Sequence, residues 1–391
     1  MLPAHTVDKE KSTATQSKTI VVKDKNVSRS LDKEMVTRSS GKSFALSEVT
    51  DRKIKRASLS QSSSKWRKLS ERTQNPEAES EAAKKKKNDQ GFHECEVFRA
   101  SVDAIESAFA WEKCTKNPGH ENFIPIAEFS MSHLPTQYQS LTVMGCITNV
   151  AKCTARLRVC YTSWERPHDY TFAVARGTKI PYTGSGYVYR ITPGKGLCPC
   201  PDSHEPNWWK IYVQTACHVV FNTEEAKATE VDLFYDDEKA CVDGRMKTMQ
   251  GMEVLEKNLL GDRCELVCFT HDSVLVKELQ SLMEQSRHSF HALCHEQYKS
   301  VINNLCVAVS HPHAQPKQVT LGKVTSRKKQ WGIGRRTFSY STDTCRGSSG
   351  APIIMPLGAI TIKSPWVAPH STTTDDGKLN MSGVGDIWLL S

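Results

Sequence analysis

Hydrophobic and polar positions change their period along this chain of 391 residues. Near residue 100, apolar side chains recur at the 3.6-residue spacing of a helix face, namely Val97, Phe98, Val102, Ile105 and Phe109. This spacing predicts a short amphipathic helix. From Thr142 onward, short segments rich in β-branched and aromatic residues alternate with turn formers, as in "LTVMGCITNV", "TARLRVCYTS" and "GSGYVYRITPG". This second pattern predicts strands.

One helical pattern separates two strand-rich blocks. Between the blocks, one helix face collects large apolar residues, namely Leu275, Leu279, Leu282, Phe290 and Leu293. We therefore expect a short helical lead-in over residues 91–139, a first β-rich half over about 140–271, a helical connector over 272–297 and a second half over about 298–391. Two β-rich halves joined by a connector are what a double β-barrel requires, so the predicted fold class is mainly β.

Residues 1–90 carry the excess charge of the chain and show no core pattern. They hold 21 Lys and Arg against 12 Asp and Glu, whereas residues 91–391 hold 31 of each. Ordering a chain costs about 1–2 kcal/mol per residue, and here few apolar side chains could offset that cost. We therefore expect a disordered basic tail. Its clusters Arg52–Arg56 and Lys84–Lys87 could serve nuclear import or weak nucleic-acid binding, or could only keep the chain in solution.

The sequence indicates neither a secretion signal nor a membrane span. No apolar segment follows Met1, and no run of 18 apolar residues occurs. We expect an intracellular protein, cytoplasmic or nuclear or both, without a membrane partner. In that setting the fourteen cysteines should be reduced thiols rather than a disulfide framework. The sequence leaves the oligomeric state open.

Three motifs in the strand-rich region carry candidate chemistry. His218 ends the apolar stretch "VQTACHVV", Asp262 begins the alternating stretch "GDRCELVCF", and Ser349 lies in the turn "TCRGSSGAP" between glycines. A histidine, an acid and a serine in this order are separated here by 44 and 87 residues. Separations of about 45 and about 93 residues occur in a well-characterised triad of these three residue types.

These motifs resemble those of trypsin-like serine peptidases. Thr215-Ala216-Cys217-His218 is similar to the Thr-Ala-Ala-His of that family, and "CRGSSGAP" is similar to its Cys-x-Gly-Asp-Ser-Gly-Gly-Pro. The resemblance covers about residues 140–391 and is to the intracellular members. It implies a chymotrypsin-like double β-barrel and a serine endopeptidase that acts on proteins or peptides through a covalent acyl-enzyme, without a cofactor.

The resemblance also implies a role for each site residue. His218 would take the proton of the Ser349 hydroxyl, and Asp262 would hold the imidazole in the required tautomer. The backbone N–H groups of Gly347 and Ser349 would stabilise the oxyanion. Asp262 is the least distinctive of the three, because Arg263 follows it where the family has an apolar residue, and Asp272 and Asp236 are the alternatives.

The substrate pocket has two interpretations. Asp343 lies six residues before Ser349, at the place that forms the base of the primary pocket in the family, and would favour a Lys or Arg side chain. Alternatively, residues near Trp366 and His370 shape the pocket and favour an apolar side chain. Pro369 departs from the family because it lacks the N–H group of a substrate-pairing strand.

The remaining candidates concern activation, metals and a second function class. Ser348 replaces the Asp that pairs with a newly cut N-terminus in secreted relatives, so we expect activity without N-terminal processing. Cys198, Cys200 and His204 could begin a zinc site but better fit a tight loop, and His311 and His313 better fit turn residues than ligands, so no metal site is predicted. The alternative function is a peptidase-like binding or scaffold protein with a decayed triad, associated with nucleic acid through its tail.

Overall fold

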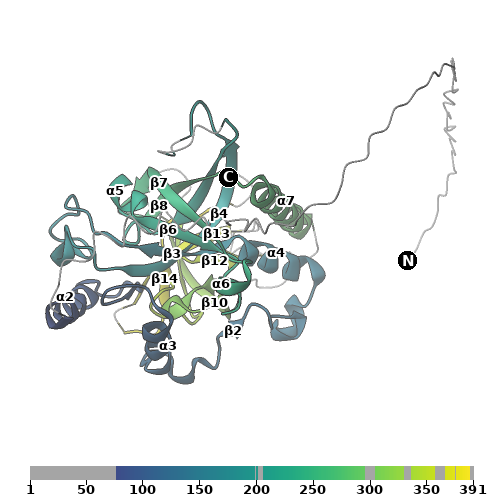
Figure 1. The fold of residues 1–391 in the computed structure, drawn as a ribbon. Coiled ribbons are helices and arrows are strands. Elements are labelled where there is room, and N and C mark those ends of the chain that lie inside the picture. The colour runs from purple at the N-terminus through teal and green to yellow at the C-terminus, as the bar shows by residue number, and fades with distance from the viewer. Residues whose placement is uncertain are drawn as a thin grey trace, which may run out of the picture. The chain divides into compact units, whose positions relative to one another are not determined.

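The strands of this protein close into two antiparallel barrels, each of six strands. The computed structural model describes residues 76–198, 200, 206–295, 304–329, 336–356, 366–374 and 376–387. The part of the expected basic tail before residue 76 lies outside the described residues. Figure 1 shows the strands of both barrels in the middle of the molecule with the helices around them.

The first barrel contains the strands β3 to β8. They are β3 (Thr154–Val159), β4 (Tyr182–Pro193), β5 (Trp209–Thr215), β6 (Thr229–Leu233), β7 (Lys247–Asn258) and β8 (Arg263–Thr270). The hydrogen-bonded order is β4-β3-β6-β7-β8-β5, and the pairing of β4 with β5 closes the barrel. A short strand, β1 (Glu96–Val97), adds to β4. Closure leaves the six strands without a free edge.

The second barrel repeats this connectivity. Its strands are β9 (Leu305–Ser310), β10 (Gln318–Lys329), β11 (Arg336–Tyr340), β12 (Pro352–Met355), β13 (Trp366–Thr373) and β14 (Asn380–Ser382). Their order is β11-β14-β13-β12-β9-β10, closed by β10 and β11, with β2 (Ile124–Pro125) beside β10 and β15 (Asp386–Ile387) beside β13. In both barrels the first three strands are neighbours in chain order and the last three return in reverse order. This topology confirms the predicted chymotrypsin-like double barrel.

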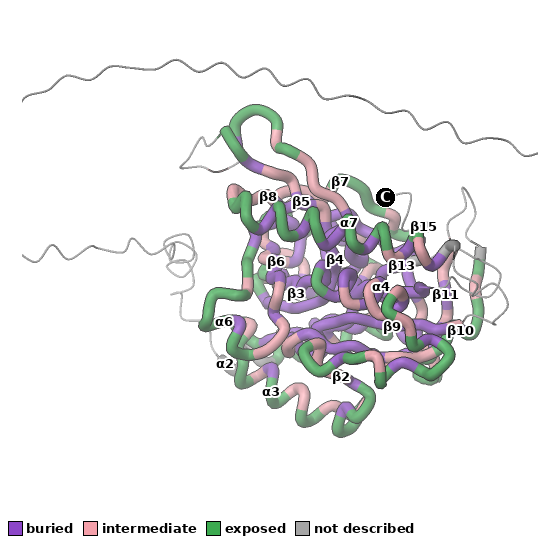
Figure 2. Tube along the Cα trace, turned by 90° about the vertical axis from the view of Figure 1, so that its right-hand side faces the viewer, coloured by how far each residue is buried: buried purple, intermediate pink, exposed green. Residues whose placement is uncertain are grey.

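The helices lie outside the barrels. They are α2 (Pro76–Asp89), α3 (Ala104–Glu112), α4 (Leu141–Lys152), α5 (Thr223–Lys227), α6 (Ala240–Asp243) and α7 (Ser273–His295). The helix α7 is the expected connector and lies beside α4 (Figure 1). Figure 2 shows buried residues concentrated in the barrel strands and exposed ones on the outer helices. None of the helices within the described residues is long and apolar enough to cross a bilayer.

One segment expected as a strand is a helix. The stretch "LTVMGCITNV" forms α4, whose N-terminus is capped by the Ser140 hydroxyl, which accepts a hydrogen bond from the Val143 N–H at 3.1 Å. The prediction was wrong because β-branched residues are common in both states. The buried positions of α4 recur at helical spacing and pack with α7 in one core, namely Val143, Cys146, Ile147 and Val150.

The lead-in differs from its predicted pattern as well. Val97 is in strand β1, and α3 begins only after Asp103, whose carboxylate accepts from the Glu106 N–H at 2.8 Å. Ile105 is 84% exposed and Phe109 is 57% exposed, so the apolar spacing did not mark a buried face. The lead-in is instead held by its backbone, since β1 and β2 each extend a barrel sheet.

Part of the region expected as tail forms the helix α2. Its Lys86 is fully buried and donates hydrogen bonds to the Thr162 hydroxyl at 2.6 Å and to the Ile180 carbonyl at 2.9 Å. The same ammonium group lies 4.0 Å from the centre of the Tyr182 ring. Lys87 pairs with Glu96 at 2.8 Å. Two of the four lysines in the Lys84–Lys87 cluster are therefore engaged in holding the fold.

Candidate active site

Three chain segments bring the predicted site residues together. His218 follows β5, Asp262 immediately precedes β8, and Ser349 lies in the turn before β12. The first two come from neighbouring strands of the first barrel, because β5 and β8 pair along their whole length. Ser349 belongs to the second barrel. The site therefore lies where the two barrels meet.

The side chains of these residues form one hydrogen-bonded chain. The Nδ1 atom of His218 is 2.7 Å from Oδ2 of Asp262, and its Nε2 atom is 2.6 Å from Oγ of Ser349. The His218 backbone N–H also donates to Oδ1 of Asp262 at 3.1 Å, and the Ser371 hydroxyl donates to Oδ2 at 2.6 Å. The carboxylate is thus fixed from three directions. Neither Asp236 nor Asp272 occupies this place.

Burial and charge set the protonation of the pair. Burial lowers the pKa of His218 to about 4, against the opposing effect of the Asp262 carboxylate. Burial alone would raise the pKa of Asp262, but the charge of the His218 ring and its hydrogen bond outweigh this and hold that pKa well below its usual range. At neutral pH the imidazole is therefore uncharged and can accept a proton, while the carboxylate is ionised.

Glycines on either side of Ser349 allow the backbone of the turn. Gly347 has φ 95° and Gly350 has φ 80°, both in the left-handed region that favours glycine. A Cβ atom on Gly347 would lie 2.4 Å from the His311 carbonyl oxygen, and one on Gly350 would lie 2.1 Å from the Thr215 hydroxyl. No other residue type fits at either position without displacing backbone or buried groups.

A segment of the lead-in crosses the site. The Glu94 carbonyl oxygen accepts hydrogen bonds from the N–H groups of Gly347, at 2.6 Å, and Ser349, at 3.2 Å. The Glu94 N–H lies 2.9 Å from Oγ of Ser349. Just before it, His93 forms an antiparallel bridge with Thr372, and the Thr373 N–H donates to the Phe92 carbonyl at 3.2 Å. Two amide donors thus converge on one carbonyl, beside the Ser349 hydroxyl.

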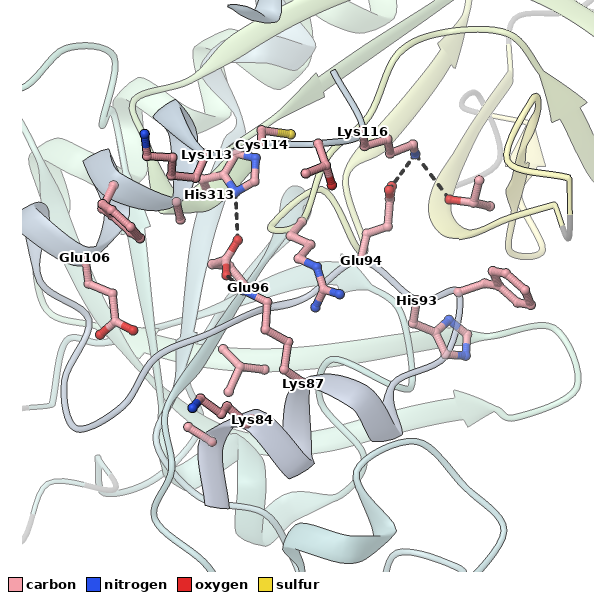
Figure 3. A pocket seen from close by; sticks show the side chains of 18 of the residues that line it. Lys84, Lys87, His93, Glu94, Glu96, Glu106, Lys113, Cys114, Lys116 and His313 are labelled. Atoms are coloured by element: carbon pink, nitrogen blue, oxygen red, sulfur yellow. Dashed lines mark hydrogen bonds and ion pairs between the residues drawn. The ribbon is translucent and has the colours of Figure 1, made fainter. Parts of the chain in front are cut away.

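The Glu94 side chain enters a pocket lined by polar groups. Its Oε2 atom is 2.7 Å from Nε2 of His370, and its Oε1 atom is 2.5 Å from the ammonium nitrogen of Lys116. Figure 3 shows Lys116 directed at this carboxylate. Burial alone would raise the pKa of Glu94, but the hydrogen bond from His370 and the charge of Lys116 outweigh it, so the pKa is well below its usual range. The carboxylate is therefore ionised in this pocket.

Asp343, the residue expected at the base of the pocket, lies elsewhere. Its carboxylate accepts a hydrogen bond at 2.8 Å from the side-chain amide of Asn122 at the exposed surface. The pocket that holds Glu94 is built around His370 instead. His370 is one of the two residues that the alternative interpretation named for the pocket. Pro369 does not interrupt the pairing of the lead-in segment, because the donor comes from Thr373.

The two substitute acids have other partners. Asp272 accepts hydrogen bonds from the N–H groups of Val274 and Leu275 at the start of α7, both at 2.9 Å. Asp236 accepts from the Lys317 ammonium group at 2.7 Å. Ser348 is buried, and its hydroxyl donates to the Ser310 hydroxyl at 3.1 Å. The partner of Ser348 is therefore a neutral side chain.

The metal-ligand candidates are arranged differently from the expectation. Cys198 and Cys200 lie near His271, whereas His204 lies outside the described residues. The ring of His311 stacks on Tyr235, and its Nδ1 atom is 3.0 Å from the Gln315 carbonyl oxygen. His313 is not a simple turn residue. It joins a cluster that the sequence analysis missed, with Cys114, His120 and Cys345.

Comparisons with known proteins find similarity among solved structures alone, and at low identity. No protein-family model matches the chain, and no curated protein matches it. Among solved structures it is similar to that of the HtrA-type protease AlgW with a tripeptide, at 13% identity and a TM-score of 0.33. That match covers 61% of this chain and 58% of the AlgW chain. The Rv3671c protease in an inactive form matches at 12% identity and a TM-score of 0.32, over 64% of this chain and 90% of the other.

The class of fold follows from the barrels themselves. Two closed six-stranded barrels of the same connectivity, with the predicted residues gathered where they meet, form the double barrel expected of a trypsin-like serine peptidase fold. This confirms the family resemblance that the three motifs indicated, at the level of the fold.

Proposed function

We propose that this protein is a serine endopeptidase in which Ser349 is the nucleophile. The observation that carries the proposal is the continuous hydrogen-bonded chain from Asp262 through His218 to Ser349, with two amide donors on one carbonyl oxygen beside it. A hydroxyl, a neutral base, an orienting acid and an oxyanion site are the parts that acyl transfer from a peptide bond needs.

Each residue has one step in this proposal. Ser349 Oγ attacks the carbonyl carbon of the scissile bond while Nε2 of His218 takes its proton. The N–H groups of Gly347 and Ser349 stabilise the negative charge on the carbonyl oxygen. His218 then gives the proton to the leaving amine, the C–N bond breaks, and an ester on Ser349 remains. Water, deprotonated by the same imidazole, hydrolyses the ester.

A fluorophosphonate probe tests this proposal. Wild type should be labelled at Ser349 and should cleave members of a peptide library. Ser349→Ala should lose labelling and lose about 10⁴-fold or more of the cleavage rate. Ser341→Ala, an exposed serine nearby in the chain, is the matched control and should behave as wild type. A folded wild type that is neither labelled nor active would instead support the scaffold alternative.

We further propose an intracellular location. The structure describes the side chains of thirteen of the fourteen cysteines; none of these thirteen forms a disulfide bond, and most of them are buried. Reduced cysteines fit a compartment in which thiols stay reduced. Imaging of the tagged full-length chain, with and without residues 52–56, would separate a nuclear from a cytoplasmic location. Recovery of the protein only from the culture medium would overturn the proposal.

A further inference from the structure

Two cysteines and two histidines from distant parts of the chain meet beside the catalytic turn. Cys114 follows α3, His120 ends the single-turn helix Pro118–His120, His313 lies in the turn Pro312–Ala314, and Cys345 begins the turn that holds Ser349. One ligand atom from each lies within 4.8 Å of all the others. We propose that these four residues bind a structural zinc ion.

Two of the separations in the cluster match those of a tetrahedral zinc site. The Cys114 and Cys345 sulfur atoms are 3.5 Å apart, and the Cys345 sulfur is 3.4 Å from Nε2 of His120. Zinc bonds of about 2.3 Å to sulfur and about 2.0 Å to nitrogen place tetrahedral ligand atoms about 3.3–3.8 Å from one another. Two thiolates and two imidazoles are also a common ligand set of closed structural zinc sites.

The groups around the cluster have the arrangement of an outer shell. Nδ1 of His313 is 2.7 Å from the Glu96 carboxylate, as Figure 3 shows, which directs the other ring nitrogen toward the cluster. That nitrogen, Nε2, is buried, has no conventional hydrogen-bond partner and faces the Cys114 thiol. Asn117 donates to both sulfur atoms, from its backbone N–H to Cys114 at 3.5 Å and from its side chain to Cys345 at 3.0 Å.

The place of the cluster gives the ion a role. Cys345 lies two residues before Gly347, and the His313 N–H donates to the Arg346 carbonyl at 2.5 Å. Cys114 and His120 lie in the lead-in, whose strands β1 and β2 are two residues long. A zinc ion would therefore fasten the lead-in to the turn that positions Ser349.

The main competing arrangement is a disulfide bond. The two sulfur atoms are closer than two unrelated thiols usually lie, yet well beyond the bonded distance of about 2.05 Å. A disulfide would leave the buried Nε2 of His313 without a partner, whereas a zinc ion would bind it, and both Asn117 contacts are those expected of thiolate ligands.

Metal analysis of the purified full-length chain tests the proposal. Protein expressed with zinc and without chelator should carry about one zinc ion per chain. Cys114→Ser and His120→Gln should lose most of it, and Cys160→Ser, an exposed cysteine outside the cluster, should retain it. Cobalt substitution should give the absorption of a tetrahedral site with thiolate ligands in wild type only. Folded wild type without metal, or a Cys114–Cys345 disulfide found by peptide mapping, would overturn the proposal.

A second observation carries an inference that rests on the proposed function. The lead-in segment from Phe92 to Glu94 pairs with the end of β13 and places one carbonyl between the two amides, as a substrate strand would. The geometry points to Glu94 as a bound substrate side chain, so the enzyme cleaves after glutamate and the Glu94–Cys95 bond is its own substrate.

The pocket is built to bind a carboxylate. Oε2 of Glu94 meets Nε2 of the fully buried His370, whose Nδ1 is 2.5 Å from the Tyr340 hydroxyl. A phenol that donates to Nδ1 leaves Nε2 as the N–H donor, so a neutral ring can bind an ionised acid. Lys116 neutralises the other oxygen and also contacts the hydroxyls of Thr344 and Thr373. An aromatic ring or a lysine would leave both donors unpaired, and an amide would offer one acceptor oxygen where the carboxylate offers two.

The surrounding cavity adds to the preference for acidic segments. A cavity of about 610 Å³ lies beside the lead-in segment and carries four lysines, namely Lys84, Lys87, Lys113 and Lys116 (Figure 3). The lining also contains Arg99, Arg346 and the carboxylates of Glu94, Glu96 and Glu106, so positive groups are in excess. A cavity with a net charge raises the local concentration of the opposite charge. Acidic residues near the cleaved glutamate are therefore favoured.

Self-cleavage follows the proposed chemistry. Ser349 Oγ bonds to the Glu94 carbonyl carbon, His218 passes the serine proton to the Cys95 nitrogen, and the C–N bond breaks. Water then hydrolyses the Ser349 ester. The products are a chain that ends with the Glu94 carboxylate and a chain that begins with the Cys95 amine.

Mass spectrometry of the incubated full-length chain measures this reaction. Wild type should yield a fragment that begins at Cys95, Glu94→Gln should yield it at least about tenfold more slowly, and Ser349→Ala should stay intact. In added peptides that span residues 91–98, glutamate should be preferred over glutamine, phenylalanine or lysine at the Glu94 position. Lys116→Met should reduce this preference about tenfold, and Lys113→Met, a lysine of the same cavity without a contact to Glu94, should not.

The outcomes separate this inference from the proposed function. Fluorophosphonate labelling of Ser349 together with cleavage after other residues would overturn the glutamate preference and leave the endopeptidase standing. Loss of Ser349-dependent labelling and of all cleavage, in both wild type and Glu94→Lys, would overturn the endopeptidase itself. The Glu94→Lys variant is included because a lysine beside Lys116 should leave the pocket and open the site.

Discussion

The ring of His93 stacks on the ring of His218, with the centroids 3.9 Å apart and the planes inclined by 20°. His93 comes from the lead-in and His218 from the first barrel, so the contact closes one side of the site. It also contributes to the burial that lowers the pKa of His218 to about 4. The candidate base is therefore shielded by a residue of the segment that occupies the cleft.

Removal of this ring should make the site more accessible. In His93→Ala, we expect fluorophosphonate to label Ser349 several-fold faster than in wild type, because both His218 and the cleft lose their cover. The measurement is the labelling rate at neutral pH. His133→Ala, an exposed histidine of the lead-in outside the site, should label at the wild-type rate. Equal rates for all three proteins would show that the segment leaves the cleft in solution.

The buried histidines make stability depend on pH. Burial lowers the pKa of both His218 and His370, so each stays neutral in the folded protein at pH values where the unfolded chain binds a proton. Stability from this source is complete above about pH 6.5 and is lost as the pH falls toward about 4, by up to about 3 kcal/mol for His218. Asp262, with a lowered pKa, adds a further loss below that window.

Chemical denaturation at several pH values measures this loss. Wild type should lose stability steadily from pH 6.5 to pH 4. His218→Gln should lose less over the same range, whereas the exposed His288→Gln should follow wild type. Constant stability across the window would contradict the burial of a neutral His218.

A buried ion pair supports the His218 loop. Arg166 is 1% exposed, and its Nε donates to Glu225 at 2.6 Å, while its Nη2 donates to the His218 carbonyl at 3.0 Å. Loss of one partner leaves an uncompensated buried charge, which costs about 3–5 kcal/mol. We expect this loss for Glu225→Gln in thermal or denaturant unfolding. Arg245→Ala, which breaks an exposed pair with Asp237, should leave the unfolding midpoint unchanged.

The sequence predicted the parts of the fold that depend on local pattern and order. His218, Asp262 and Ser349 were identified because each lies in a recognisable motif, and the connector helix followed from five apolar positions on one face. Segment α4 was assigned wrongly, since Ile and Val fill helices and strands alike when a segment is buried. Its partner α7 lies more than 120 residues away in the sequence, which no local pattern reports.

The lead-in carried no signal for its main contacts. Phe92 and the Glu94 carbonyl bind through backbone groups, and backbone pairing does not depend on residue type. The Glu94 side chain meets His370, which lies 276 residues away in the sequence, so no local pattern reports that contact either. The zinc ligands were missed for a related reason. Cys114 and Cys345 are separated by 231 residues, so they show no paired spacing. The two interpretations of the pocket stayed open because the position of Asp343 in the motif does not report where its side chain points.

The lead-in should be required for folding, whereas the region before residue 76 should not. Cys95 and Phe98 are fully buried, and β2 pairs with the second barrel. A chain that begins at residue 140 should therefore aggregate or unfold. A chain that begins at residue 76 should fold with the wild-type melting temperature. Ser348 has a neutral hydroxyl as its partner, so the turn does not need the charge of a new N-terminus. We therefore expect the uncleaved full-length chain to be active without N-terminal processing.

The turn after the nucleophile should tolerate no side chain. At Gly350, φ is 80° and a Cβ atom would lie 2.1 Å from the Thr215 hydroxyl and 2.3 Å from the Ser185 carbonyl oxygen. That hydroxyl already donates to the same carbonyl at 2.8 Å, so it cannot move without breaking a buried hydrogen bond. We expect Gly350→Ala to cost about 2–5 kcal/mol through strain and overpacking combined. Ser349 should also lose its fluorophosphonate reactivity.

A second glycine isolates the steric part of this effect. Gly244 has a similar φ of 83°, but nothing lies within 4 Å of its added Cβ. Gly244→Ala should therefore cost only the backbone strain, about 1–2 kcal/mol, and should keep full reactivity at Ser349. Comparison of the two variants by denaturant unfolding and probe labelling measures the difference. Equal losses of stability in both variants would mean that the turn can shift away from Thr215 and that the close packing around Ser349 is not required.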